Sequence, residues 1–297
     1  MAANNIYLEQ EFPSPIKQLW LTFRSSPIAI VAFSVYVLLA FLALVGNFIT
    51  PHDVLENNLD KLLLPPAWSS DGDISHLLGT DDLGRDMLSR LISGTSLTFG
   101  LSFVVVFIAM TVGVLIGSFS AITRGVKASF LTHFLDVILS IPSLLLAIII
   151  VAILGPGLSN VLWALALVSI PQFVHVTRNA IKQEQKKDYV LIPILDGASE
   201  VRVLITSIFP NIVDKLIIQA TLAQSAAILD IAALGFLGLG APIPMPEWGS
   251  MLATSLDLFY LAPWTTYLPG LAILVTVMAT NLVGEGFRHA LKIQKES

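Results

Sequence analysis

Long apolar stretches separated by polar connectors dominate the chain, and six of them are long enough to cross a bilayer. They cover residues 27–49, 97–121, 134–154, 160–177, 216–241 and 266–287. A hydrocarbon core of about 30 Å needs roughly 20 helical residues, each of which adds ~1.5 Å. The pattern therefore predicts an all-α, polytopic membrane protein with six transmembrane helices.

The polar segments divide the chain into parts. Residues 1–26 form a lead before the first span, 27–49, which is too long for a signal-peptide core and is expected to remain as an anchor. Residues 50–96 form the largest segment beyond the membrane. Residues 97–291 form the main transmembrane domain, interrupted by a polar connector at 178–215, and residues 292–297 form a tail.

Positive charge is distributed unevenly between the two sides of the predicted membrane. Thirteen Lys and Arg residues fall in segments on the side of the N-terminus, whereas only Lys61, Arg85 and Arg90 fall on the other side. Because Lys and Arg accumulate in cytoplasmic loops, both termini are expected in the cytoplasm. The segment 50–96 is then periplasmic, and it holds eight acidic residues.

Composition supports a lipid environment and excludes several kinds of chemistry. Charged residues make up 12% of the 297 residues, whereas soluble domains carry about 25%. The chain has no cysteine, which excludes disulfides, thiol catalysis and thiolate metal sites. No HExxH or GxSxG motif is present, and the five histidines show no ligand spacing, so we expect no catalytic or metal site and no cofactor bound by this chain.

Prolines and small residues within the spans favour a packed bundle. Pro142, Pro171 and Pro269 lie inside predicted spans, and each is expected to kink its helix where neighbours cover the freed carbonyl. Gly113 and Gly117 have the spacing that lets two helices approach closely, although glycine is also common in membrane helices generally.

The stretch GTDDLGRDMLSRLISG, residues 79–94, predicts an amphipathic helix outside the membrane. Thr80 is placed to cap it, Gly94 to end it, and Asp81–Arg85 and Asp86–Arg90 to form i,i+4 pairs. Gly79 and Gly84 have the spacing of a phosphate loop. However, Arg85 and Asp86 replace the required Lys and Ser or Thr, so the chain is not expected to bind ATP. A calcium site built from the aspartates is a less favoured alternative.

The connector 178–215 contains more than positive charge. Ile192, Ile194 and Leu195 form an apolar cluster, Asp196-Gly197 is a turn signal, Ser199 can cap a second helix, and Pro210-Asn211 is expected to end it. Two short helices joined at a glycine, with exposed apolar residues, suit docking into the groove of a partner. From these residues alone, an amphipathic helix at the membrane surface is an equal alternative.

Three carboxylates lie within predicted spans. Asp136 and Glu285 lie near the ends of their spans, where they can reach the interface, and are interpreted as structural. Asp230 lies near the middle of the fifth span, where a carboxylate costs roughly 2.5–3.5 kcal/mol on insertion scales. Two interpretations of Asp230 remain open: a residue of a translocation path or its gate, and an interhelical hydrogen bond, for example to Asn281.

Several motifs resemble those of permeases from ATP-binding-cassette (ABC) importers of the dipeptide, oligopeptide and nickel family. The connector has Tyr189-Val190, then Gly197, then Pro210-Asn211 at the family's spacing, but it has Leu191-Ile192-Pro193 where the family has Glu-Ala-Ala. Pro193 is therefore expected to make the first connector helix irregular. Further similarity lies at residues 76–94, 135–148, 227–252 and 281–288.

Within that family, His133, Asp230 and Gly235 replace commoner residues and indicate a subgroup of peptide permeases. The resemblance implies a type I importer core in the bacterial inner membrane, paired as a heterodimer with a second permease. Two cytoplasmic ATPases that use ATP and Mg²⁺ would contact the connector, and a periplasmic binding protein would deliver substrate; no nucleic acid is expected. The coupling residues it implies are Asp188, Tyr189, Val190, Asp196, Gly197, Ala198, Ser199, Pro210 and Asn211.

The resemblance implies alternating access, with peptides as cargo, cationic antimicrobial peptides included. Haem, polyamines and nickel are alternative cargoes. An ATP-independent channel is disfavoured because no selectivity loop stands out. An intramembrane hydrolase has only His133 and Asp136 as candidates, without a nucleophile beside them.

Overall fold

The computed structural model describes residues 14–123 and 126–296, and the regular structure in this part of the chain is helical, without a β-strand. The predicted all-α fold class is confirmed. Twelve α-helices occupy the described residues: α1 Pro15–Arg24, α2 Pro27–Ile49, α3 Met87–Thr95, α4 Leu101–Ile122, α5 Val126–Leu139, α6 Ser143–Leu154, α7 Leu158–Glu184, α8 Asp188–Leu195, α9 Glu200–Val203, α10 Phe209–Phe236, α11 Trp248–Ser255 and α12 Trp264–Glu296.

Five helical segments of the described chain are long and apolar enough to span a membrane, and a bent pair of helices makes a sixth if it is counted as one span. The five are Pro27–Ile49, Met87–Ile122, Leu158–Glu184, Glu200–Phe236 and Trp264–Gln294. They agree with five of the predicted spans, although most extend further than the apolar pattern indicated.

The third predicted span, residues 134–154, is not a straight helix. It is divided into α5 and α6, which meet at an angle of 91°. Pro142 stands just before α6 with an extended backbone, and a proline also disfavours helical geometry in the residue before it. By contrast, α7 and α12 continue through Pro171 and Pro269 as single helices.

Two π-helical turns join helices that the sequence pattern separated. Ser96–Gly100 joins α3 to α4, and Leu204–Ile208 joins α9 to α10. The predicted helix stops at Gly94 and at Pro210-Asn211 are therefore wrong. Pro210 lies in the first turn of α10, directly after the π-helical turn. Proline is tolerated in the first turn of a helix, where the backbone N–H that it lacks has no partner within that helix.

The core of the bundle is formed largely where α4 crosses α7. A Cβ atom added to Gly117 would lie 2.8 Å from the Cβ atom of Thr177, and one added to Gly113 would collide with Phe173. Both residues of α7 are fully buried. The close approach predicted from the Gly113–Gly117 spacing is confirmed, and larger residues here would separate the two helices.

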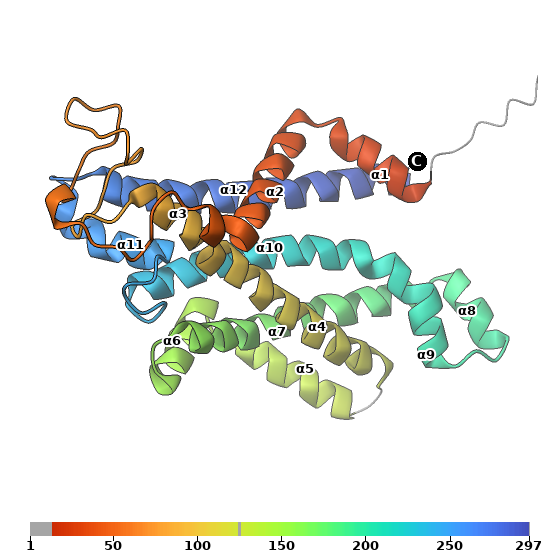
Figure 1. Ribbon diagram of the computed structural model, residues 1–297. Helices are drawn as coiled ribbons and strands as arrows, with labels where there is room; N and C mark the ends of the chain where they lie inside the picture. Colours follow the sequence, from red (N-terminus) through yellow and green to blue (C-terminus); the bar gives the residue numbers. More distant parts are fainter. Residues whose placement is uncertain (1–13, 124–125, 297) are drawn as a thin grey trace, which may run out of the picture.

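The two ends of the bundle carry different structures (Figure 1). One end, here called the α8 end, carries α8 and α9 together with α1 and the C-terminal part of α12. Phe23, Ala29 and Ala290 form a buried cluster that holds α1, α2 and α12 together there. The opposite end, here called the α11 end, carries α11 and the loop segment 50–86.

Candidate functional site

At the α8 end, α8, α9 and the turn between them, residues 188–203, form a compact unit that we call the elbow (Figure 1). Gly197 has a φ of +84°, and its N–H donates to the carbonyl of Ile194 at 3.1 Å. The N–H of Ala198 donates to the carbonyl of Pro193 at 2.9 Å. These two bonds form a Schellman motif, which ends α8 and requires a residue that tolerates positive φ.

The other predicted features of the elbow are mostly present. The hydroxyl of Ser199 accepts the N–H of Arg202 at 3.4 Å and so caps α9, and Glu200 lies in its first turn. The expected irregularity at Pro193 is wrong, since α8 remains helical around it. The proline removes one hydrogen bond to the preceding turn, and the Schellman bonds hold the end of the short helix in place.

The elbow has one buried face and one exposed face. Val190 and Val203 are 0% and 2% exposed, and they pack on a cluster formed by the ends of three long helices. Its members include Ala121 of α4, Ile181 of α7 and Ile212 of α10. The exposed face is also apolar, because Ile192 and Leu195 are 60% and 84% exposed. An apolar face of this kind is expected to bind a partner.

An acidic residue that the sequence analysis missed fastens the elbow to the bundle. Glu184, buried at the end of α7, accepts a hydrogen bond from the hydroxyl of Tyr189. Its two carboxylate oxygens lie 2.9 and 2.7 Å from the Nζ atom of Lys187. Burial, followed by the contact with Glu184, raises the pKa of Tyr189 to about 12. The phenol is therefore neutral and remains a donor at physiological pH.

The remaining predicted coupling residues lie around this unit. Asp188 is the first residue of α8, where a negative charge is favourable, and Asp196 follows its last residue. Pro210 and Asn211 lie outside the elbow, in the first turn of α10. The side-chain amide of Asn211 donates to the carbonyl of Ser207 at 2.7 Å, within the π-helical turn.

The carboxylates within the spans have different surroundings. Asp230 of α10 is half-buried, and within the part of the chain that the structure describes it forms no hydrogen bond or ion pair. The alternative bond to Asn281 is therefore not formed. Asp136 accepts from Nε2 of His175 at 2.6 Å and so links α5 to α7, whereas Glu285 pairs with Arg288 on its own helix at 2.8 Å.

The motif at residues 79–94 differs from the predicted helix, because α3 begins only at Met87. Gly79 and Gly84 have φ values of +79° and +73°, which no helix accommodates. The hydroxyl of Thr80 donates to the carbonyl of Lys61 at 2.6 Å and fastens this loop instead of capping a helix. Asp86 is the cap, accepting the N–H of Ser89 at 2.8 Å.

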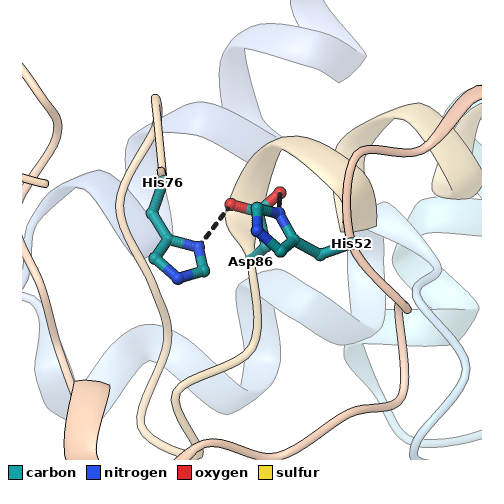
Figure 2. Close-up of side chains that lie close together, drawn as sticks. All are labelled: His52, His76 and Asp86. Carbon is teal, nitrogen blue, oxygen red and sulfur yellow. Dashed lines mark hydrogen bonds and ion pairs between the residues drawn. The ribbon is translucent and has the colours of Figure 1, made fainter. Parts of the chain in front are cut away.

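Of the two predicted ion pairs in this motif, one is present. Arg85 Nε lies 2.7 Å from a carboxylate oxygen of Asp81. Arg90 also faces Asp81, at 3.6 Å, and the predicted Asp86–Arg90 pair is wrong. Asp86 instead accepts from Nδ1 of His76 at 3.0 Å and lies close to His52 (Figure 2). Because both histidines lie in irregular chain, helical or strand periodicity could not bring them together.

A second buried carboxylate organises the α11 end. Glu247 is 0% exposed and caps α11, accepting the N–H groups of Gly249 and Ser250, each at 2.8 Å. It also accepts the hydroxyl of Thr98 at 3.1 Å, which ties the loop after α10 to the π-helical turn before α4. Burial raises the pKa of Glu247, and its hydrogen bonds lower it in part.

Comparison with known proteins identifies the family. Residues 113–292 match the family model described as "Binding-protein-dependent transport system inner membrane component". The chain belongs to this family. Residues 14–66 also match the "N-terminal TM domain of oligopeptide transport permease C". The protein is therefore a multi-pass inner-membrane permease subunit of an ABC transporter and not an enzyme, and membership implies an ATPase and a substrate-binding partner.

Relatives of this permease are similar along nearly its whole length. It is 45% identical over 291 residues to the "Peptide transport system permease protein SapC" of Salmonella typhimurium, covering 98% of each chain. It is 46% identical over 282 residues to the "Di/tripeptide transport system permease protein DppC" of Pseudomonas aeruginosa, covering 94% of this chain and 92% of the relative. These relatives confirm the family that the motifs indicated. They also confirm the subgroup of peptide permeases indicated by His133, Asp230 and Gly235.

A solved structure supports the fold. The MetNI methionine ABC transporter in an inward-facing conformation matches with a TM-score of 0.57 at 18% sequence identity. The match covers 71% of this permease and 97% of the matched chain. The predicted type I importer permease core is confirmed as a fold.

Proposed function

We propose that this permease imports peptides by alternating access and that the elbow is where cytoplasmic ATPases act on it. The observation that carries the proposal is the two-faced elbow. Its inner face is joined to the ends of α4, α7 and α10, and its outer face exposes Ile192 and Leu195. A groove on an ATPase would bury that outer face.

The path from the elbow into the membrane is short and continuous. α9, the π-helical turn and α10 form one helical segment, Glu200–Phe236, which also carries Asp230. Thirty helical residues between Glu200 and Asp230 extend roughly 45 Å. A displacement of α9 by a partner is therefore transmitted along one helix to Asp230, which we place on the translocation path or its gate.

The arrangement of the ends supports a cytoplasmic elbow. α1 and the C-terminal part of α12 lie at the same end as the elbow (Figure 1), and that end receives most of the Lys and Arg residues. We infer that both termini and the elbow are cytoplasmic and that residues 50–86 and α11 face the periplasm and the binding protein.

The partners proposed are a second, related permease, two ATPase subunits and a periplasmic binding protein, with lipid around the bundle. ATP and Mg²⁺ are bound by the ATPases, since no phosphate loop occurs in this sequence. Peptides, cationic antimicrobial peptides included, are the proposed cargo because the permeases at 45% and 46% identity are named for peptide transport. Haem, polyamines and nickel are the alternative cargoes.

The test is reconstitution of the four-component transporter in proteoliposomes, with ATP inside and the binding protein and a labelled peptide outside. We expect the peptide to accumulate only when both ATP and the binding protein are present. Flux without ATP would indicate a channel. ATP-dependent accumulation of haem, polyamine or nickel in place of peptide would refute the proposed cargo and leave the transport mechanism standing.

A further inference from the structure

His52, His76 and Asp86 converge at the α11 end from three separate parts of the chain (Figure 2). His52 follows α2, His76 lies in the loop that follows, and Asp86 caps α3. One ligand atom from each lies within 4.8 Å of the others. The two imidazole rings are stacked, with centroids 4.6 Å apart and an angle of 27° between their planes.

The distances match those of a metal-binding set. Two donor atoms that each lie about 2.0–2.1 Å from a tetrahedral Zn²⁺ ion are roughly 3.3 Å apart. The Nδ1 atom of His76 lies 3.0 Å from one oxygen of Asp86, and that of His52 lies 3.7 Å from the other. The two spacings lie on either side of the expected value, although they end on different oxygens of the same carboxylate. An ion held by both imidazoles would therefore sit in front of the Asp86 carboxylate.

His52 supplies a second, independent observation. Its Nδ1 atom is buried and has no hydrogen-bond partner among the described residues. A buried polar atom without a partner is costly, and this one faces the carboxylate of Asp86. Ser89 holds that carboxylate in place, with its N–H at 2.8 Å and its hydroxyl at 2.7 Å. Such outer hydrogen bonds orient the ligands of metal sites.

We propose that His52 Nδ1, His76 Nδ1 and the carboxylate of Asp86 bind a divalent transition-metal ion of the Zn²⁺ class, with water as a further ligand. Two imidazoles and one carboxylate suit Zn²⁺, Ni²⁺ or Cu²⁺ better than Mg²⁺ or Ca²⁺, which prefer oxygen. The proposal replaces the sequence-based expectation that this chain carries no metal site.

The protons and charges are consistent with binding. Without metal, His76 Nδ1 donates its proton to Asp86, because an ionised carboxylate is only an acceptor. Metal binding moves that proton to Nε2, or releases it if the ring was charged. Arg85 and Arg90 both face Asp81, and Arg85 also lies 3.9 Å from Asp82, so these two carboxylates balance their positive charges.

The site also has a route for entry and a structural consequence. The side chain of His52 is 35% exposed, whereas those of His76 and Asp86 are 7% and 2% exposed. An ion can therefore enter past His52 and be enclosed by the other two ligands. Once bound, it joins the end of α2, the loop containing His76 and the start of α3, and so fixes the segment 50–86 against the bundle.

The test uses the full chain in the assembled transporter, purified in nanodiscs with a tag that contains no histidine. Equilibrium dialysis against Zn²⁺ measures affinity and stoichiometry for the wild type and for His52→Gln, His76→Gln and His133→Gln. His133→Gln is the matched control, because the side chain of His133 is 79% exposed and lies on α5. X-ray absorption at the zinc edge counts the imidazole ligands.

We expect one Zn²⁺ that is bound in the wild type and in His133→Gln by two imidazoles and is bound at least about 10-fold more weakly in His52→Gln and His76→Gln. A single remaining imidazole in His52→Gln would confirm the ligand assignment. Zn²⁺ retained equally by both variants, or a wild-type absorption spectrum without two imidazole ligands, would overturn the proposal. His52→Gln removes no hydrogen bond of the Nδ1 atom, so loss of folding does not obscure the result.

Discussion

Replacing Gly197 with alanine tests whether the geometry of the elbow matters, because it strains the backbone and leaves every contact in place. Gly197 has a φ of +84°, and a Cβ atom added there meets nothing within 4 Å. The cost is therefore conformational. An L-residue in the left-handed region costs about 1–2 kcal/mol, which corresponds to a change of roughly 5–30-fold in the population of the ordered elbow.

The measurement is amide hydrogen exchange of residues 188–203 in the purified permease. We expect exchange within α8 to be about 5–30-fold faster in Gly197→Ala than in the wild type. Gly155 provides a control outside the elbow: it follows α6, its φ is +92°, and an added Cβ meets nothing within 4 Å. Gly155→Ala also strains the backbone, here in a region open essentially to glycine alone, and exchange in the elbow should remain at the wild-type rate.

A stronger change separates structure from function. Proline at position 197 cannot adopt the required φ, and it removes the N–H that donates to the carbonyl of Ile194 at 3.1 Å. In the reconstituted transporter, Gly197→Pro should continue to hydrolyse ATP while peptide uptake falls. Wild-type uptake per ATP in Gly197→Pro, or equal acceleration of elbow exchange in Gly197→Ala and Gly155→Ala, would show that the backbone geometry at Gly197 does not determine the order or the coupling role of the elbow.

Three other changes test separate parts of the account. Tyr189→Phe removes the hydrogen bond to Glu184 and should destabilise the elbow by about 1 kcal/mol, seen as faster exchange. Because the pKa of Tyr189 is raised from 10.0 to about 12, folding favours the neutral phenol. The resulting stabilisation should be complete below pH 10 and be lost as pH rises through 12. Melting of Tyr189→Phe should lack this pH dependence. Asp230→Asn should change the transport rate while the complex still assembles by size-exclusion chromatography, and loss of assembly would instead show a structural role. Gly113→Val should collide with Phe173 and destabilise the permease by several kcal/mol, about 3 or more, measured as a lower melting temperature, and a wild-type melting temperature would contradict the packing of α4 on α7.

The helical fold was largely predictable, because a helix that crosses a lipid bilayer needs about 20 mainly apolar residues in succession. Residues 27–49 form the helix that their apolar run predicted, with the same ends. The kink expected at Pro142 is present as the 91° bend before α6. An error arose where α9 continues into α10, because that continuation depends on a π-helical turn that no apolar pattern encodes.

The elbow was also predictable, because its signals are local. Gly197 and Ser199 end one helix and begin the next through bonds that span only a few residues. Contacts between distant residues gave no such signal. Glu184 fastens the elbow from the end of the preceding long helix, and His52 and His76 meet across a loop whose path depends on the whole fold.

Cytoplasmic ATPases are proposed to bind the exposed face of the elbow, and cysteine crosslinking can locate that contact. The sequence contains no cysteine, so Leu195→Cys and Tyr260→Cys each introduce a single thiol. Leu195 ends α8 and is 84% exposed, and Tyr260 lies between α11 and α12 and is 95% exposed. In native membranes we expect Leu195→Cys to crosslink to an ATPase subunit and Tyr260→Cys not to do so. Crosslinking of the ATPase through position 260, or labelling of position 195 from the periplasm, would show that the elbow does not bind the ATPase.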